Sequence, residues 1–285
     1  MNGKVKILIS MAVFGTIGIF VRFIPLSSAM IAFCRGVLGC VFLLCFMAAT
    51  GKKLNLQEVK ANGWRLALSG AAIGINWILL FEAYRHTTVA IATICYYLAP
   101  AFMTLASPLV GEKLNVKKLA CIGVALVGMV FVSGVFQGAE NGSLLGVLLG
   151  VGAALFYATV ILLNKTLSPI GAYDRTLCQL GAASIVIIPY LLIGGGITFV
   201  EMTTLGWVML AVVGIIHTGI AYTLYFGAIR DVNAQTAAIL SYLDPVLSIL
   251  LSALILRERL DVFSIIGAVL ILGSALYSEL PGRKK

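Results

Sequence analysis

The stretch TICYYLAPAFMTLASPLVGE at residues 93–112 occurs a second time, as AILSYLDPVLSILLSALILRE at residues 238–258. Both copies contain the motif Tyr-Leu-x-Pro, ending at Pro100 and at Pro245, and both continue as an apolar run that closes on a glutamate. A proline in the middle of a soluble helix would disrupt it, whereas a membrane helix tolerates proline and often bends there around a cavity. The repeat therefore indicates a duplicated membrane protein whose functional site lies near the two prolines.

The composition excludes an ordinary soluble domain. Of the 285 residues, 61% are apolar and 11% are charged, whereas a soluble domain carries about 25% charged residues. Nearly every window of about 20 residues is apolar enough to cross a bilayer as a helix. The six cysteines lie inside apolar segments without metal-ligand spacing, so we expect packing roles and neither a disulfide framework nor a metal site. The pattern predicts ten spans, at residues 5–23, 27–49, 65–85, 89–109, 117–135, 143–165, 174–193, 204–226, 234–256 and 262–280.

The basic residues predict the orientation of the chain. If the N-terminus is cytoplasmic, 15 of the 20 Lys and Arg residues fall in inner segments, and Arg35 alone lies within the membrane. The outer segments then hold Arg22, Arg85, Arg257 and Arg259. We therefore expect a multi-pass protein of the cell membrane with both termini in the cytoplasm. The net charge of +9 is spread over short loops and chain ends, which is not the pattern of a nucleic-acid-binding face.

The duplication predicts two inverted halves. The first five spans lie in residues 1–137 and the second five in residues 142–285, and together they form one membrane transport domain. The longest polar connection, residues 50–64, is too short for another folded domain. The expected fold is an all-α integral membrane protein with ten transmembrane helices in two five-helix repeats. Since each half holds an odd number of spans, the halves enter the membrane from opposite sides, and such repeats place a substrate site near the midplane.

Four features recur at matching places in the two halves. They are Arg35 with Gln179 in the second span, Pro100 with Pro245, Gly111-Glu112 with Arg257-Glu258 before the last span, and Ile122-Gly123 with Ile266-Gly267 at its start. This arrangement is similar to the EamA-type family of the drug/metabolite transporter superfamily, and the matching features cover nearly the whole chain. The resemblance implies ten spans in two five-helix repeats and a transport function. One departure is Phe14-Gly15, where many relatives have Trp-Gly.

Asp244 is the acidic residue expected deepest in the membrane. It lies about ten residues into the ninth span, hence ~15 Å deep at 1.5 Å per residue. A charge at a helix centre costs roughly 2.5–3.5 kcal/mol on insertion scales. The residue that corresponds to Asp244 in the first half is Ala99, so the fold does not require a carboxylate at this position. We expect Asp244 to bind a cationic group of the substrate or to carry a coupling proton. The alternative is a structural ion pair with Arg35.

Three further polar groups are candidates. The family resemblance implies that Arg35 braces helices through carbonyl oxygens or a carboxylate. His217, near the middle of the eighth span, is a proton relay, a substrate contact or a satisfied interior histidine. Glu82, near the outer end of the third span, is a second coupling candidate, with an i,i+3 pair to Arg85 as the alternative.

Helical spacing indicates which faces turn inward. Polar residues form a stripe in the fourth span and another, through Ser241, Asp244 and Ser248, in the ninth. Aromatic rings at mid-depth lie away from the interfacial belts, so they indicate a cavity lining, with simple packing as the alternative. The candidate substrate-binding residues are Asn76, Trp77, Tyr97, Tyr157, His217, Tyr222 and Asp244. The candidate hinge and positioning residues are Arg35, Pro100, Pro245, Glu112 and Glu258.

These features favour a secondary active or facilitative transporter, an exporter or exchanger that works by alternating access. The expected cargo is a small polar metabolite, amino-acid-like or cationic, with a proton as the candidate coupling ion. We expect the protein to lie in the lipid bilayer and to have no catalytic residues, cofactor, metal or nucleic-acid partner. The sequence is compatible with both a monomer and a homodimer. The alternatives are a channel-like pore, which would need a continuous polar ring, and an intramembrane enzyme acting on lipid, which would need clustered catalytic groups.

Overall fold

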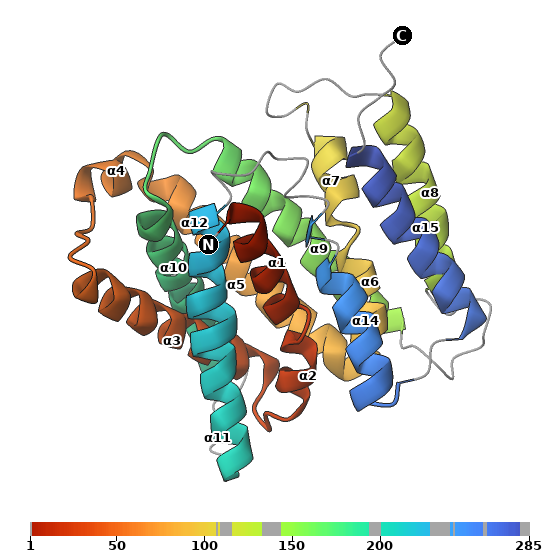
Figure 1. Cartoon of the computed structure of the whole chain (residues 1–285), viewed down its shortest axis with the longest axis horizontal. Helices are drawn as coiled ribbons and strands as arrows, with labels where there is room; N and C mark the ends of the chain where they lie inside the picture. Colours follow the sequence, from red (N-terminus) through yellow and green to blue (C-terminus); the bar gives the residue numbers. More distant parts are fainter. Residues whose placement is uncertain are drawn as a thin grey trace.

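The computed structural model describes residues 2–106, 108, 116–132, 144–193, 201–228, 240–241, 243–258 and 261–279. Throughout these residues the regular elements are helices (Figure 1). Six continuous helical segments are long and apolar enough to cross a membrane, and four shorter apolar helices accompany them. The prediction of an all-α fold with apolar spans is confirmed.

Among the described residues the first half contains eight helices, and the first seven of them cover the first four predicted spans and the connection at residues 50–64. Helix α1 joins α2 across a two-residue turn, α6 joins α7 in the same way, and α4 is a short helix between α3 and α5. Their bounds are α1 Gly3–Phe14, α2 Ile17–Arg22, α3 Ser28–Ala49, α4 Leu56–Ala61, α5 Gly63–His86, α6 Val89–Tyr96 and α7 Ala99–Ala106. The fifth span is α8, Val116–Val132.

The second half repeats this order. Its helices are α9 Leu144–Lys165, α10 Ala172–Ile193, α11 Thr204–Ala211, the π-helix η2 Val212–Ile220, α12 Ala221–Ala228, α14 Leu243–Ile255 and α15 Val262–Glu279. Helices α11, η2 and α12 follow one another without a break and make the eighth span. A π-helical turn inside an α-helical span is rare and frequently occurs at a functional site.

The two prolines of the repeated motif lie where helices begin. Pro100 is the second residue of α7, and Pro245 is the third residue of α14. In the first turn of a helix the N–H groups have no intrahelical partner, so proline removes no hydrogen bond there. The fourth span is therefore interrupted at Tyr97-Leu98, directly before α7 begins at Ala99. The side chain of Pro100 lies outside the described residues.

The polar connection at residues 50–64 contains the short helix α4. Asn55 caps this helix by accepting from the backbone N–H groups of Gln57 and Glu58. The carboxylate of Glu58 accepts from Gly171 N (3.0 Å), and Asn62 accepts from Ser168 N (2.8 Å). Polar side chains thus tie this connection to the loop between α9 and α10 in the other half.

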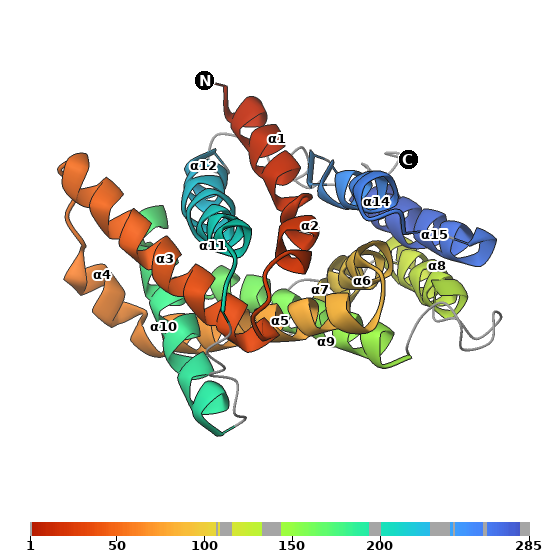
Figure 2. The same cartoon turned by 90° about the horizontal axis from the view of Figure 1, so that it is seen from below.

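The two halves pack against each other in matching pairs of helices. Span three (α5) packs on span six (α9), and in the same relation span eight (α12) packs on span one (α1). The second spans of the halves, α3 and α10, also meet, as do the last spans, α8 and α15, which lie side by side at one edge of the molecule (Figures 1 and 2). This interleaving places the largest apolar core between α3, α5 and α10, where Phe81, Leu180 and Ile187 are buried.

The contact between α5 and α10 depends on Gly70. A Cβ atom at this position would lie 2.5 Å from Ala182 Cβ and 2.6 Å from the carbonyl oxygen of Gln179. We expect Gly70→Ala to lower the free energy of unfolding by about 1–3 kcal/mol, because overpacking forces the helices apart. The matched control is Gly181→Ala, where no atom lies within 4 Å of the new Cβ. Removing that helical glycine should raise stability by roughly 0.5–1 kcal/mol.

Thermal unfolding of both variants in detergent measures this pair of opposite shifts in melting temperature. Equal melting temperatures for Gly70→Ala and the unchanged protein would contradict the close approach of α5 and α10.

Candidate functional site

The two copies of the repeated stretch meet in the structure. Thr93 Oγ1 in α6 lies 3.0 Å from Ser248 Oγ in α14, so one member of each polar stripe contacts the other. The hydroxyl of Tyr97, at the break between α6 and α7, donates to the carbonyl oxygen of Ser241 (3.1 Å) and lies beside the carboxyl group of Asp244. The polar faces predicted for spans four and nine thus turn toward each other.

Five tyrosines from three spans lie in one region, and three of them, Tyr96, Tyr97 and Tyr157, interact electrostatically with Asp244. We call Tyr96, Tyr97, Tyr157, Tyr222 and Tyr225 the tyrosine group. The rings of Tyr96 and Tyr157 lie 5.3 Å apart between centroids, and Tyr96 and Tyr97 lie 6.1 Å apart. Phe14, at the end of α1, bridges to Tyr222 (5.3 Å) and Tyr225 (6.4 Å). Tyr157 and Tyr222, predicted from the sequence, therefore lie in one aromatic region with Tyr97.

Asp244 is the second residue of α14 and is half-buried. This position favours a carboxylate, because the first turn of a helix presents unpaired N–H groups and the positive end of the helix dipole. Gly15, at the α1–α2 turn, approaches closely, since a Cβ atom there would lie 2.7 Å from the Asp244 carbonyl oxygen. Among the described residues the ion pairs are Arg22–Glu258 and His86–Glu82, so the ion pair of Asp244 with Arg35 is not formed.

Arg35 is buried in α3 and contacts a different set of residues. Its Nε donates to Thr218 Oγ1 (3.0 Å) in η2. The guanidinium lies over the ring of Trp77, 4.2 Å from its centroid, and 5.3 Å from that of Phe81. Trp77 is itself buried in the apolar core, and its ring packs against Arg35 inside the bundle.

His217 is buried in η2 and joins this π-helix to the break between α1 and α2. Its Nε2 lies 2.8 Å from Thr16 Oγ1, and its Nδ1 donates to the Val212 carbonyl oxygen (3.2 Å). The ring of Phe20 packs edge-on against it at 5.0 Å. His217 therefore connects the interrupted first span with the distorted eighth span.

Asn76 and Glu82 both lie on α5, and each has a defined partner. Asn76 Nδ2 donates to the carbonyl oxygen of Ala153 (2.6 Å) and so joins α5 to α9. Glu82 accepts from His86 Nε2 (3.3 Å), and both side chains are more than a third exposed. The alternative prediction of an i,i+3 pair between Glu82 and Arg85 is wrong, because Arg85 Nη2 donates to the Leu26 carbonyl oxygen instead.

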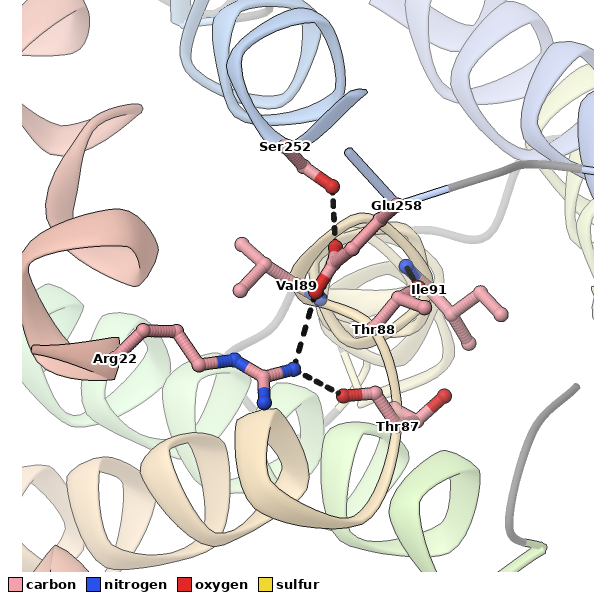
Figure 3. Close-up of polar contacts among 7 residues, drawn as sticks. All are labelled: Arg22, Thr87, Thr88, Val89, Ile91, Ser252 and Glu258. Carbon is pink, nitrogen blue, oxygen red and sulfur yellow. Dashed lines mark hydrogen bonds and ion pairs between the residues drawn. The ribbon is translucent and has the colours of Figure 1, made fainter. Parts of the chain in front are cut away.

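Glu258 joins the two halves where the end of α2, the start of α6 and the residues after α14 meet (Figure 3). One carboxylate oxygen, Oε2, accepts from the backbone N–H of Val89 at the first residue of α6 (2.9 Å) and from the hydroxyl of Ser252. The other, Oε1, accepts from Arg22 Nη2 at 3.1 Å, and the same nitrogen donates to the Thr87 carbonyl oxygen at 2.8 Å. We call Arg22, Thr87, Val89, Ser252 and Glu258 the Glu258 cluster.

The sequence did not indicate the partners in the Glu258 cluster or the position of Tyr96 in the tyrosine group. Tyr96 is adjacent to Tyr97, so the Tyr-Tyr pair itself was the available signal. Glu112, the counterpart of Glu258 in the first half, lies outside the described residues.

Comparison with known proteins identifies the chain's relatives. The model of the EamA-like transporter family matches twice, at residues 1–134 and 144–278. The chain belongs to this family. It is therefore a multi-pass membrane transporter of the EamA type, as the sequence predicted.

Individual relatives agree with this assignment. The Bacillus subtilis (strain 168) protein named "Uncharacterized transporter YxxF" is 33% identical over 270 residues, which cover 94% of this chain and 86% of that one. A "Probable amino-acid metabolite efflux pump" of Escherichia coli (strain K12) is 28% identical over 197 residues, covering 65% of each chain. One solved crystal structure superposes with a TM-score of 0.67 at 18% identity and covers 97% of this chain and 96% of that one. That likeness shows the shared fold.

Proposed function

We propose that this EamA-type protein is a secondary transporter of the cell membrane that exports or exchanges a small polar metabolite. The carrying observation is the Asp244 carboxyl group beside the tyrosine group, at the contact between the two copies of the repeated stretch. An acid with aromatic rings around it suits an amino-acid-like or cationic substrate. The name of the Escherichia coli relative supports both export and this cargo.

The proposed mechanism is alternating access between two inverted halves, residues 1–137 and 142–285, with both termini in the cytoplasm. The Glu258 cluster would hold the outer side closed, because it bonds α2 and α6 of the first half to the end of α14 in the second. The interruptions at Gly15-Thr16 and Tyr97-Leu98 and the π-helix η2 would supply the bending points. Asp244 is the first candidate for proton coupling and Glu82 the second.

Flux through proteoliposomes tests this proposal. Proteoliposomes containing the purified protein would be loaded with unlabelled amino acids or organic cations. Counterflow of the labelled compound would then be followed with and without a pH gradient. We expect saturable flux that is accelerated several-fold by substrate on the opposite side. Protein-free liposomes are the control.

Two outcomes would contradict the proposal. Flux that rises linearly with concentration and shows no counterflow would indicate a channel-like pore. Conversion of bilayer lipid by the purified protein, without solute flux, would indicate an intramembrane enzyme.

A further inference from the structure

Arg35 is a buried charge whose contacts with the protein are incomplete. It lies eight residues into α3, and 3% of its surface is exposed. A charged side chain at this depth costs several kcal/mol unless pairing, water or a functional partner compensates it. No carboxylate forms an ion pair with Arg35 within the described residues. Its compensation must therefore come largely from other groups.

Hydrogen-bond accounting shows which part of the side chain is left over. A guanidinium has five N–H donors, one on Nε and four on the two terminal nitrogens. Nε donates to Thr218, but no acceptor among the described residues bonds to Nη1 or Nη2. Among the described side chains, the polar atoms that are both fully buried and unbonded do not include Nη1 or Nη2 of Arg35. Because neither nitrogen has a hydrogen bond to a described residue, each must keep some accessible surface. The four donors on these nitrogens thus have no acceptor among the described residues and keep contact with space that a water-sized molecule can reach.

Aromatic side chains surround the guanidinium group of Arg35. Trp77 covers one face of the guanidinium, and together with Thr218 it holds the plane in place. The tyrosine hydroxyl groups that interact electrostatically with Arg35 belong to Tyr84, Tyr96 and Tyr222. Tyr84 and Tyr96 also interact with Asp244. Arg35 and Asp244 therefore border the same aromatic region from different helices.

The counterpart of Arg35 in the second half shows what a purely bracing residue looks like. Gln179 is likewise buried, and its amide nitrogen donates both hydrogens, to Ser69 Oγ and to Asn164 Oδ1, each at 2.7 Å. A neutral side chain with both of its donors bonded thus joins helices at this place in the repeat. A charge with unused donors is not required for that role.

We infer that Arg35 binds the carboxylate group of the transported substrate, an assignment that rests on the proposed transport function. The planar fork matches a carboxylate with two parallel hydrogen bonds, which is the strongest type of hydrogen bond available to this side chain. With Asp244 at the other border of the tyrosine group, the site has one group for a carboxylate and one for an ammonium. The substrate class is therefore a carboxylate-bearing, amino-acid-like metabolite.

The test compares L-amino acids with the matching L-amino acid amides, which lack the carboxylate but keep the ammonium and the side chain. Half-maximal concentrations for inhibition of proteoliposome counterflow would be measured for each acid and its amide. We expect the unchanged protein to prefer the acid by about 10- to 100-fold, the size of a hydrogen bond between charged groups. Arg35→Gln should reduce this ratio to below about threefold, and Arg35→Lys should retain part of it, because the charge remains without the fork.

The acid-to-amide ratio distinguishes a substrate-binding role of Arg35 from a purely structural role. Gln179→Met is the matched control, because it removes a bracing residue at the equivalent place and should change acid and amide inhibition equally. If Arg35→Gln does not accumulate, Arg35→Lys gives the same comparison, because its acid-to-amide ratio should fall below that of the unchanged protein. Equal inhibition by acids and amides, or an unaltered ratio in Arg35→Gln, would overturn the assignment while leaving transport intact. Absence of flux for acids, amides and simple organic cations alike would instead refute the transport function itself.

Discussion

Replacement of Asp244 by asparagine is expected to lower the rate of counterflow about 100-fold while leaving the folded protein at least as stable as before. The amide keeps the size of the side chain but can neither carry a proton nor offer a negative charge to an ammonium group. A hydrogen bond to a charged group contributes about 1.5–3 kcal/mol, which corresponds to roughly 10- to 150-fold in rate or affinity. Stability should not fall, because a neutral group is less costly to bury in a membrane.

Two measurements check this prediction. Counterflow in proteoliposomes, with and without a pH gradient, gives the functional effect, and thermal unfolding in detergent gives the stability. If Asp244 carries the coupling proton, the pH gradient should no longer accelerate flux in Asp244→Asn. The ionisable groups that interact electrostatically with Asp244 are neighbouring tyrosines, among them Tyr97 and Tyr157.

Asp244→Glu and Ser248→Ala serve as controls for the same region. Asp244→Glu keeps the charge and should retain measurable flux. Ser248→Ala removes only the neutral contact with Thr93 and should reduce flux by less than about fivefold, in line with a net hydrogen-bond contribution of ~1 kcal/mol. Unchanged uptake and an unchanged response to the pH gradient in Asp244→Asn would show that the carboxylate has no role in transport.

Replacement of Glu258 by alanine is expected to shift the protein toward the state that is open on the outer side, by roughly 30-fold in population. Glu258 is 12% exposed and accepts from Val89 N, from Ser252 Oγ and from Arg22, so alanine leaves three donors without this acceptor. The loss of one well-placed charged acceptor at a partly exposed site is worth about 2 kcal/mol. The bonds with Val89 and Arg22 join the two halves, so their loss raises the free energy of the closed state relative to the open state and shifts the population toward the open state.

Labelling of a single cysteine measures this shift. Thr93→Cys, in a background without the six native cysteines, would be exposed to a membrane-impermeant maleimide from the outer side. We expect the labelling rate to rise about 10- to 30-fold when Glu258→Ala is added, as the population estimate requires.

Glu82→Ala is the matched control at the same end of the bundle. Its ion pair with His86 lies within one helix and is more than a third exposed, so it contributes at most about 1 kcal/mol and does not join the halves. The labelling rate should stay within about twofold of the reference. A Glu258→Ala protein with an unchanged labelling rate would show that the Glu258 cluster does not close the outer side.

The candidate site was predictable from the sequence in its members but not in its contacts. The sequence predicts Asp244, Tyr97, Tyr157 and Tyr222 as site residues, because a charge or an aromatic ring at mid-depth is rare in a membrane helix. The assignment of Glu82 to Arg85 failed, because spacing on a helix permits both i,i+3 and i,i+4 pairs and only side-chain directions choose between them. Tyr84 and Tyr96 are not predictable in the same way, because a tyrosine in an apolar span is also an ordinary packing residue.

The sequence by itself determined the all-helical membrane fold and the family. The thickness of a bilayer sets the length of each span, and every backbone group must bond within its own helix, so local hydropathy is sufficient to find the spans. Tertiary structure alone decided which groups meet. Arg35 reaches Thr218 across 183 residues, His217 reaches Thr16 across 201, and Glu258 reaches Val89 across 169. These contacts follow from how the helices of the two halves rotate and pack, and close packing is a property of the assembled bundle that no single stretch contains.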